Sequence, residues 1–533
     1  MCADINYSEE TAVSEYVATT GGPVRGQIVD GMVRFLGIPY AAPPLGDLRW
    51  RPPVDPPEWQ DTFNAFAFGP ICAQNNSCYP GFAINSNTED CLYLNVWVPQ
   101  TVERNVSLPV MVWIPGGGLF MGGSDDYDPG ALVRDGRVVF VSLNYRVSIF
   151  GFFSHPSINA EDHAVGNYGI MDQQLALHWV RKNIERFGGD PHNVTIFGES
   201  AGGASVLCHM ASPDSAGLFH RAILQSCSVL ATAMTASVES VETVGIELAT
   251  AAGCDIQTSD NLRSIPTTDL LAANVVPPGG FGPGPYHMHV TVDGTIIPAP
   301  IQELFASGRF NVVPTMNGIN RDEFTWFLGM MELATGVRVT NETYSAAAGP
   351  VFAAVSRLLP FTVSDETVPK ILERYPAEKH ESANRALAAA VGDAGLICGG
   401  GWRTTRMISA RTADVYAYEF DVLDAPVAWP AVSFPYGSGH TQEIQFLFPL
   451  FHGSSGTPTG LSDLQQQLSR TMVHYWTTFA RLGTPNDGSP NVPGWPRYEA
   501  GRDAFLLLTT PEPETIENFS ETHFIKFWDG FYP

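Results

Sequence analysis

The sequence predicts an α/β protein with a large, mostly parallel central sheet flanked by helices. Apolar, β-branched runs at residues 108–114 and 194–197 predict buried strands, and the second leads without a loop into a small-residue helix expected over 201–210. No Gly/Ser-rich or Pro-rich linker and no internal repeat divides the 533 residues. We therefore expect one domain over residues 1–533, with 1–20 as a loosely held N-terminal segment.

The composition is strongly acidic. With 29 basic and 55 acidic residues, the formal net charge is −26. This charge disfavours nucleic acid and anionic membrane surfaces as partners, and its simplest effect is to keep a secreted or organellar protein in solution. The chain has no apolar run of about 18 residues, so we expect no stable membrane insertion.

Signals of cellular location favour a secreted or extracellular protein over a cytoplasmic one. The first ten residues contain neither a basic segment nor an apolar core, so no signal peptide is visible, which leaves a removed leader or an intracellular protein as alternatives. The eight cysteines are neither dense nor regularly spaced, which excludes a disulfide scaffold and a zinc site and leaves a bridge or two. Six N-x-S/T sequons would allow the protein to be a glycoprotein, and they begin at Asn6, Asn75, Asn105, Asn193, Asn341 and Asn518. Asn193 borders the strand at 194–197, so we expect it to be structural.

The strand at 194–197 runs directly into the pentapeptide G-E-S-A-G at 198–202. A sharp strand-to-helix turn at this point lifts the hydroxyl of Ser200 above the sheet and exposes the next backbone N–H, that of Ala201. Gly198, Gly202 and Gly203 supply the small residues that such a turn needs. The pentapeptide alone is weak support for a nucleophile, but its place between a strand and a helix strengthens the prediction.

A second glycine-rich turn follows the strand at 108–114, in P-G-G-G at 115–118. Successive glycines let the backbone approach a ligand, and the N–H groups of Gly117 and Gly118 are candidates, with that of Ala201, for stabilising an oxyanion. A plain turn or a phosphate loop is the alternative, but a phosphate loop would continue with the Lys-Ser/Thr that is absent here.

Several longer motifs make a resemblance specific. The chain is similar to the type-B carboxylesterases, the cholinesterase and lipase family of α/β-hydrolases, with matches in the family's order from about residue 20 to the C-terminus. The resemblance implies an α/β-hydrolase fold whose long insertions form a substrate gorge or lid. The matching motifs are F-L-G-I-P-Y-A-A-P-P-L-G-D-L-R-W at 35–50, E-D-C-L-Y-L-N-V-W-V-P at 89–99, V-S-L-N-Y-R at 141–146, G-L-F-H-R-A-I-L-Q-S at 217–226 and V-D-G-T-I-I-P at 292–298.

The resemblance also implies the partners of the nucleophile. The family's acid lies in a segment that resembles G-I-N-R-D-E at 318–323, after an expected strand at 312–316. Glu323 is the candidate acid, and its neighbour Asp322 is the alternative. His440, which follows the G-S-G turn and opens H-T-Q-E-I-Q-F-L-F, matches the catalytic histidine, and the order Ser, acid, His agrees with this fold. Most of the other 12 histidines need no function.

Such a triad performs acyl transfer with neither a cofactor nor a metal. His287 and His289 alternate along an expected strand without a third ligand nearby, and we expect them to be structural. Glu199 and Ser226 resemble residues that hydrogen-bond around the triad in the family. Buried ion pairs are implied for Arg49 with Glu89 and for Arg146 with Asp172.

The cysteine matches are incomplete. The resemblance implies a bridge between Cys72 and Cys91, but Cys78 lies between them and leaves the pairing open. The family's next bridge would join Cys254 to a position that is Asn261 here, so we expect Cys254 to be unpaired.

The departures from the family concern substrate choice. Cholinesterases stack a quaternary ammonium on a tryptophan before E-D-C-L, whereas the segment 72–91 offers Tyr79 and Phe82 but no tryptophan. The segment after Q-S contains Leu230 and small residues where cholinesterases have a tryptophan. We expect these three residues to line the substrate pocket and do not expect choline selectivity.

The sequence thus predicts a serine carboxylesterase that acts on small-molecule esters with a broad or medium-chain acyl preference. A lipase, or a specialised esterase of a natural product, toxin or polyester, is the alternative. The family also contains non-catalytic adhesion proteins, which typically lack the serine, the glycine run or the histidine that this chain retains. The sequence does not indicate an oligomeric state.

Overall fold

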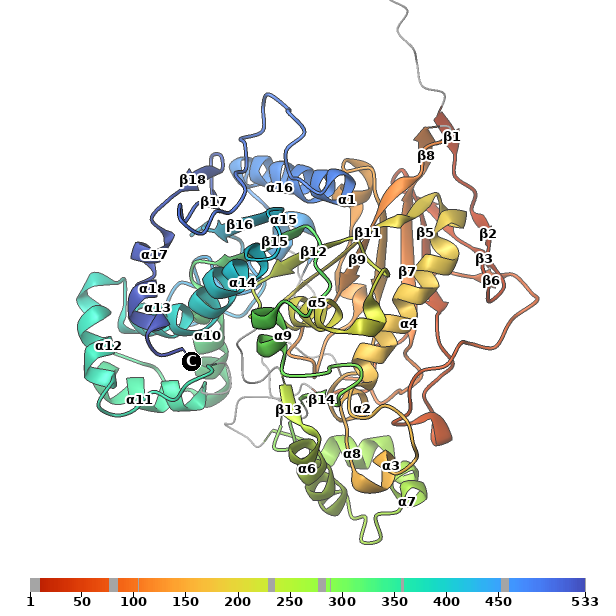
Figure 1. Ribbon diagram of the computed structural model, residues 1–533, viewed down its shortest axis with the longest axis horizontal. Helices are drawn as coiled ribbons and strands as arrows, with labels where there is room; N and C mark the ends of the chain where they lie inside the picture. Colours follow the sequence, from red (N-terminus) through yellow and green to blue (C-terminus); the bar gives the residue numbers. More distant parts are fainter. Residues whose placement is uncertain are drawn as a thin grey trace, which may run out of the picture.

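The computed structural model describes residues 10–75, 85–103, 105–228, 235–276, 284–287, 289–355, 359–451 and 460–532 (Figure 1). The expected pocket residues Tyr79, Phe82 and Leu230, together with Cys78 and Asn6, lie outside the described residues.

An eleven-stranded sheet runs through the molecule in the order β18-β17-β16-β15-β12-β11-β9-β10-β7-β5-β4. The central strands β17, β16, β15, β12, β11, β9 and β10 pair parallel with one another. At the two edges the pairing is antiparallel: β18 pairs with β17 at one edge, and β7, β5 and β4 follow β10 at the other. The predicted sheet is confirmed, with antiparallel edges added. Its strands are β4 (Gln27–Val29), β5 (Met32–Pro39), β7 (Tyr93–Pro99), β9 (Leu108–Ile114), β10 (Val139–Leu143), β11 (Gly189–Glu199), β12 (Arg221–Gln225), β15 (Thr315–Asn320), β16 (Val415–Phe420), β17 (Phe505–Leu508) and β18 (Glu514–Ile516).

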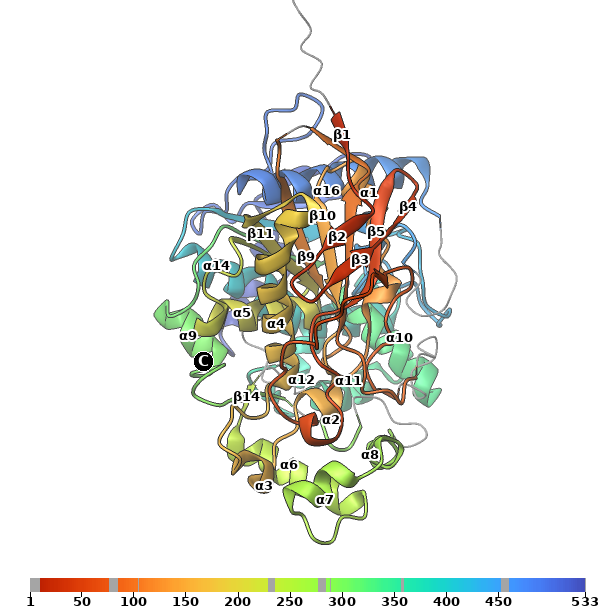
Figure 2. The ribbon, with the colours of Figure 1, turned by 90° about the vertical axis from the view of Figure 1, so that its right-hand side faces the viewer.

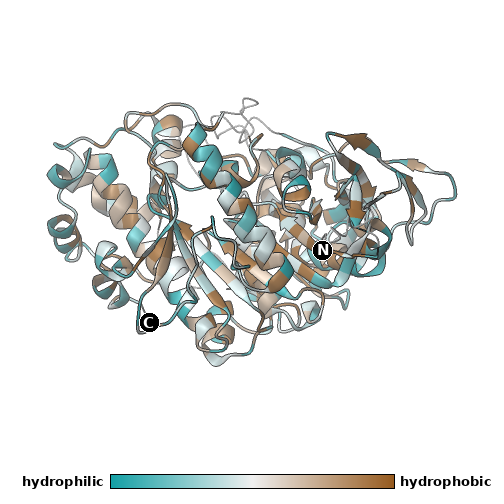
Figure 3. Cartoon of the chain, turned by 90° about the horizontal axis from the view of Figure 1, so that it is seen from above, coloured by the Kyte–Doolittle hydropathy of each residue, from teal (hydrophilic) through white to brown (hydrophobic). Residues whose placement is uncertain are grey.

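The central strands are apolar at successive positions because both faces of the sheet are covered. Along β9, Val110 and Val112 belong to one apolar cluster, while Met111 and Trp113 belong to a second. Side chains of a strand alternate between its faces, so the two clusters lie on opposite sides of the sheet. In Figure 3 the brown strands accordingly lie between helices with teal outer surfaces.

Helices cover the two faces of the sheet. Residues of α4 (Tyr168–Asn183) and α5 (Ala201–Ala211) belong to the first cluster, and residues of α1 (Gly130–Arg134) and α16 (Asp463–Leu482) belong to the second. A capping box between Ser462 and Gln465 starts α16, and Gly483 ends it in the left-handed conformation. Figure 2 looks onto the edge where the N-terminal strands lie.

The strand expected at 312–316 starts later, at Thr315. Val312 is 44% exposed, and Pro314 has no N–H to contribute to the sheet. The strand predicted at 194–197 extends in both directions, to Gly189 and Glu199, and the helix predicted over 201–210 is α5.

Two groups of shorter helices lie outside the sheet, α6 to α8 at the bottom and α11 to α13 at the left of Figure 1. The helices are α2 (Ser148–Gly151), α3 (Pro156–Asn159), α6 (Val238–Ala251), α7 (Ser259–Ser264), α8 (Thr267–Ala273), α9 (Ile301–Ser307), α10 (Glu323–Thr335), α11 (Tyr344–Ala354), α12 (Val368–Arg374), α13 (Ala383–Gly392), α14 (Thr405–Ser409), α15 (Ile444–Leu447), α17 (Phe519–Thr522) and α18 (Ile525–Asp529), with a π-helix at Asp393–Thr404. The small sheets pair β1 (Glu10–Ala12) with β8 (Thr101–Glu103), β13 (Thr235–Ser237) with β14 (Val290–Val292), and β3 (Pro23–Arg25) with both β2 (Tyr16–Ala18) and β6 (Phe63–Asn64).

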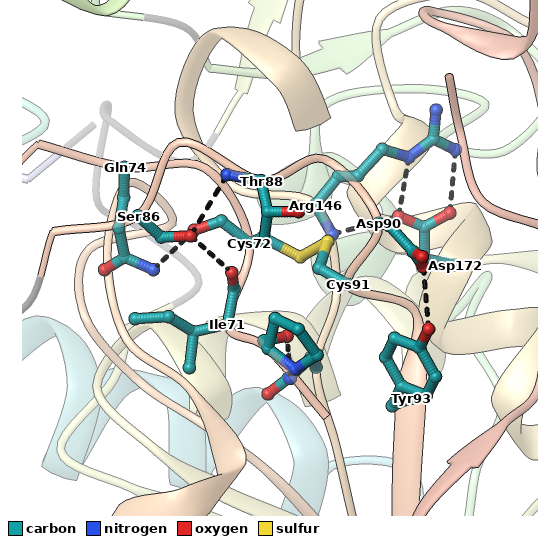
Figure 4. Close-up of a disulfide and its surroundings, with 12 residues drawn as sticks. Ile71, Cys72, Gln74, Ser86, Thr88, Asp90, Cys91, Tyr93, Arg146 and Asp172 are labelled. Carbon is teal, nitrogen blue, oxygen red and sulfur yellow. Dashed lines mark hydrogen bonds and ion pairs between the residues drawn. A yellow bond between two sulfur atoms is a disulfide. The ribbon is translucent and has the colours of Figure 1, made fainter. Parts of the chain in front are cut away.

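A disulfide joins Cys72 to Cys91, as the resemblance implied, and closes a separation of 19 residues (Figure 4). Close to it, Arg146 donates from Nε and Nη2 to the two carboxylate oxygens of Asp172 at 2.8 and 2.7 Å. Within the described part of the chain, Cys254 is a free thiol, as expected.

The second expected ion pair, between Arg49 and Glu89, is also present and buried. Arg49 additionally donates to the carbonyl of Ile265 at 2.5 Å. Both ion pairs therefore connect segments that are distant in the sequence. No helix among the described residues is long and apolar enough to cross a membrane.

Candidate active site

Ser200 lies in a strained turn between β11 and α5. Its φ of 56° and ψ of −120° fall outside the regions that a non-glycine residue ordinarily adopts. The turn is packed too tightly for larger neighbours, because a Cβ on Gly202 would lie 2.0 Å from the carbonyl oxygen of Ile114. The backbone N–H of Ser200 donates to the carbonyl of Gln225 at 2.8 Å, which fixes the turn against β12. This geometry is that of a nucleophile elbow.

The glycine run after β9 lies against this elbow. A Cβ on Gly116 would lie 2.7 Å from the carbonyl oxygen of Glu199. Gly117 and Gly118 adopt φ values of 102° and 64°, which turn the backbone back at the carboxyl edge of the sheet. The structure thus places both predicted oxyanion donors and the elbow that contains Ala201 in one region.

Glu323 and His440 are in direct contact. Oε2 of Glu323 lies 2.6 Å from Nδ1 of His440, and both side chains are buried. The other oxygen of Glu323 accepts from the backbone N–H of Asn320 at 2.9 Å. Because the turn between β15 and α10 holds the carboxylate in this way, Glu323 can fix the orientation and tautomer of the imidazole.

The alternative acid Asp322 faces elsewhere. Its carboxylate lies 3.0 Å from Nη2 of Arg385 and accepts from the backbone N–H of Ser438 at 3.0 Å. Of the two neighbouring carboxylates, Glu323 is the one in contact with the imidazole.

The second nitrogen of His440, Nε2, lies 3.1 Å from Oε1 of Glu199. A third carboxylate, that of Glu443, is also buried nearby and accepts from Gln225 Nε2 at 3.2 Å and Asn320 Nδ2 at 2.7 Å. Glu443 was not identified from the sequence, although its position three residues after His440 in H-T-Q-E was a usable signal.

These charges change the protonation of the site. Burial alone would lower the pKa of His440, but the carboxylates of Glu199, Glu323 and Glu443 outweigh it and raise the pKa to about 9. Burial raises the pKa of Glu199 well above its usual range, and it raises that of Glu443 as well. The cluster therefore retains a proton more strongly than its isolated groups would.

Ser226 is buried at the end of β12, with φ at 52°, and its backbone N–H donates to the carbonyl of Gly318 at 2.8 Å. No described residue forms a hydrogen bond with its hydroxyl, in contrast to the hydrogen bonding expected of it.

Aromatic side chains surround the imidazole, and sequence reasoning missed them. The ring of Phe327 lies 5.0 Å and that of Trp326 lies 6.0 Å from the ring of His440. Trp429 packs against Trp326 at 5.7 Å and donates to Thr441 Oγ1 at 3.3 Å. A usable signal for them was present in the sequence. Trp326 and Phe327 follow Glu323 within one turn of α10, and Trp429 lies 11 residues before His440.

The rings of His287 and His289 lie 4.5 Å apart, and His287 contacts the ring of Phe120. Among the residues described, no group of three or more His, Cys, Asp or Glu side chains could hold a metal ion.

A surface cleft of about 600 Å³ lies at the amino ends of the parallel strands, on the edge of the sheet away from Ser200. Asn193, whose sequon was expected to be structural, accepts a hydrogen bond from Arg221 there. The cleft is lined by Asp190, His192, Asn193, His220, Arg221, Pro314, Asp414, Leu482, Gly483, Thr484 and Arg497.

Glu199, which precedes the elbow serine, contacts the imidazole of the buried Glu323–His440 pair. This arrangement is typical of a hydrolase site on an α/β sheet, and comparison with known proteins agrees. The carboxylesterase family model matches residues 13–528. The chain belongs to this family and has its α/β-hydrolase fold. Accordingly, it is a carboxylic ester hydrolase.

Similar proteins span nearly the whole chain. An acetylcholinesterase of Bungarus fasciatus is 35% identical, covering 97% of this chain and 86% of the relative. An acylcarnitine hydrolase of Mus musculus is 34% identical, covering 97% and 91%. Carboxylesterase 1C of Rattus norvegicus is 33% identical, covering 96% and 92%.

Proposed function

We propose that the protein is a serine carboxylesterase in which Ser200 is the nucleophile, His440 the general base and Glu323 the acid that orients it. The observation that carries the proposal is the 2.6 Å contact between Glu323 and His440, whose Nε2 lies 3.1 Å from Glu199, the residue next to Ser200 in its strained turn. With Nδ1 occupied by Glu323, the base is Nε2, the nitrogen that also faces Glu199.

In the first half of the reaction, Oγ of Ser200 bonds to the ester carbonyl carbon while its proton passes to Nε2 of His440. The carbonyl electrons move onto oxygen, where the N–H groups of Gly117, Gly118 and Ala201 stabilise the oxyanion. The bond from carbon to the alcohol oxygen then breaks, and the alcohol leaves with the proton from His440. An acyl group remains on Ser200.

In the second half, water replaces the alcohol. His440 takes a proton from the water as its oxygen bonds to the acyl carbon, and the same oxyanion donors act again. The bond to Oγ of Ser200 breaks, and the serine recovers its proton from the imidazole. Neither half of this sequence uses a cofactor or metal.

We expect a broad or medium-chain acyl preference, with acyl groups larger than acetyl favoured. Phe327, Trp326 and Trp429 supply apolar surface beside His440, and aromatic rings contribute large buried areas. Two relatives are named for esters other than choline esters, an acylcarnitine hydrolase and a cocaine esterase, the latter from Homo sapiens at 32% identity. Tyr79, Phe82 and Leu230 remain candidates for the same pocket.

The proposed location is outside the cytosol. The bridge between Cys72 and Cys91 favours an oxidising compartment. Asn341 and Asn518 begin sequons and are exposed, so they are available to a glycan. A mass shift on treatment of the secreted protein with an N-glycosidase, lost in the Asn-to-Gln variants, tests this part.

Labelling with an organophosphate tests the nucleophile. Intact-mass analysis should find one adduct per chain, located on Ser200 by peptide mapping. Ser200→Ala should retain the fold by circular dichroism, lose the adduct and lose about 10⁴-fold or more in kcat. Stoichiometric labelling at another residue, or normal turnover by Ser200→Ala, would overturn the assignment.

A further inference from the structure

The carboxylate of Asp322 lies next to Glu323 in sequence but belongs to a different set of contacts. It forms an ion pair with Arg385 of α13 at 3.0 Å, and the two side chains are only 13% and 12% exposed. A charge pair of this kind is costly to break because the remaining partner is left largely buried. The contacts around this ion pair show which segments of the chain it connects.

The segment that carries His440 runs alongside the turn that carries Glu323. The backbone N–H of Asp322 donates to the carbonyl of Ser438 at 3.0 Å, and that of His440 donates to the carbonyl of Glu323 at 3.3 Å. Asn320 donates from its side chain to the carbonyl of Gly439 at 2.7 Å. Asp322 and Gly439 form an isolated parallel bridge, so the backbones of the two segments are joined directly.

Arg385 contacts both of these segments. Besides Asp322, it donates from Nη1 to the carbonyl of Tyr436 at 3.2 Å. A Cβ on Gly437 would lie 2.3 Å from Oδ2 of Asp322 and 2.4 Å from Nη1 of Arg385. The glycine therefore allows the histidine segment to approach the ion pair closely.

The arginine is itself firmly placed. Helix α13 begins at a side-chain cap from Ser382, whose hydroxyl accepts from the backbone N–H of Arg385 at 3.2 Å. Leu387 and Val391 of the same helix are buried in the apolar cluster that includes Phe324 of α10. The insertion between β15 and β16 thus supplies a fixed guanidinium to the two segments.

We propose that Asp322 and Arg385 form a positioning pair that sets the distance between the carboxylate of Glu323 and the imidazole of His440. The proposal rests on the proposed function, since it assigns the pair an effect on that triad. Neither residue touches the substrate. Loss of the pair lets the histidine segment move away from Glu323, and catalysis depends on this alignment to within about 1 Å.

Three variants test the proposal: Asp322→Asn, Arg385→Met and Arg385→Lys. Asparagine retains an acceptor for the N–H of Ser438 but not the charge, and lysine retains the charge but not the two-pronged geometry. The matched control is Arg338→Met, which removes an ion pair with Glu332 at 3.2 Å from an arginine that is 68% exposed and is not bonded to the histidine segment. Each kcat for p-nitrophenyl butyrate is divided by the concentration of sites titrated with organophosphate.

We expect Arg385→Met to lower kcat per titrated site by about 10- to 100-fold with KM little changed, because alignment in the transition state is lost rather than binding. Arg385→Lys should recover part of this loss. The acidic limb of kcat/KM should shift to lower pH, since His440 loses contact with the carboxylate of Glu323. Combining Asp322→Asn with Arg385→Met should cost little more than either change alone.

An unchanged kcat per titrated site and an unchanged pH midpoint in all three variants would overturn the proposal, even if the variants melt at lower temperature. So would an equal effect of Arg338→Met. Ser200→Ala and Glu323→Gln distinguish failure of the positioning role from failure of the proposed function. If only the positioning role is wrong, both of these variants are still inactive. If either is active, the proposed triad fails first.

Discussion

Nε2 of His440 lies 3.1 Å from Oε1 of Glu199, at the ring nitrogen that Glu323 does not contact. The two atoms are within ion-pair distance, but their geometry is not that of a hydrogen bond. The negative charge of Glu199 favours the protonated form of the imidazole. With His440 as the proposed general base, Glu199 should therefore influence the pH at which the enzyme works.

The first prediction concerns that pH. As the proposed general base, His440 would have to be neutral, and its pKa is raised from 6.5 to about 9, so activity should fall as pH decreases through the raised value. Burial raises the pKa of Glu199, so this side chain gains a proton as the pH falls. Protonated Glu199 no longer helps to raise the pKa of His440. We expect the acidic limb of kcat/KM to have its midpoint above 6.5 and no higher than about 9.

Glu199→Gln tests whether the carboxylate of Glu199 raises the pH midpoint of the acidic limb. Removing this carboxylate should move the midpoint to lower pH by about one unit, because a nearby negative charge no longer favours the imidazolium. Glu303→Gln, at an exposed position of α9, is the control and should leave the midpoint unchanged. A midpoint that stays in place in Glu199→Gln would show that Glu199 does not set the protonation of His440.

A second prediction concerns the oxyanion donors. Gly117→Ala should lower kcat by about 10²-fold or more, since the backbone would have to move to accommodate the methyl group and a donor would be displaced. The added Cβ would lie 2.3 Å from the carbonyl oxygen of Met121, at a φ of 102°. Gly46→Ala is a matched control, because Gly46 has a φ of 55° but nothing within 4 Å of the added carbon. It should lower the melting temperature slightly and leave kcat unchanged, and equal losses in both variants would contradict the prediction.

A third prediction concerns the bridge between Cys72 and Cys91. Replacing both cysteines with alanine should lower the free energy of unfolding by about 3 kcal/mol for a separation of 19 residues, because the unfolded chain gains freedom. Denaturant unfolding measures the change, and Cys254→Ala, which removes a free thiol, is the control. Peptide mapping without reductant should recover the fragment joining Cys72 and Cys91, and recovery of Cys78 bound to either residue would refute the assignment.

The fourth prediction concerns substrate choice. We expect kcat/KM to rise from acetate to butyrate or hexanoate esters, by up to about fourfold per methylene, until the pocket is full. Butyrylcholine and its uncharged isostere 3,3-dimethylbutyl butyrate should differ little, because the sequence has no tryptophan between Cys72 and Cys91. A strong preference for acetylcholine would indicate a cholinesterase instead.

Trp326→Ala offers an internal check on that prediction. The ring of Trp326 lies 6.0 Å from that of His440, and tryptophan attracts a cation more strongly than the other aromatic residues do. If the ring only provides apolar contact, its removal should reduce kcat/KM for the choline ester and the isostere alike. A selective loss for the choline ester would show that Trp326 binds the ammonium group.

The parts of the fold and site predicted from the sequence depend on local patterns. The strands around 108–114 and 194–197 are continuous apolar runs, and the turn at Ser200 is enforced by neighbouring glycines, so each is encoded within a few residues. Glu323, His440 and the disulfide were identified through family motifs rather than through geometry. Their contacts could be described only once the fold brought them together.

What the sequence did not reveal depends on contacts between distant segments. Nothing in the residues around Arg385 indicates that its guanidinium reaches Asp322 and the carbonyl of Tyr436. Glu443 was overlooked because one buried glutamate resembles any surface glutamate in a sequence. The start of β15 was misplaced because Val312 is apolar in sequence yet exposed in the structure.

The separation of the catalytic segments along the chain has a consequence for protein synthesis. His440 follows Glu323 by 117 residues and reaches it only through the turn formed after β15. A nascent chain that ends anywhere between residues 200 and 439 contains Ser200 but not the base proposed for it. With the proposed triad, catalytic competence should therefore arise late in translation, after the elbow strand has been made, and refolding alone should not activate a protein truncated before the histidine segment.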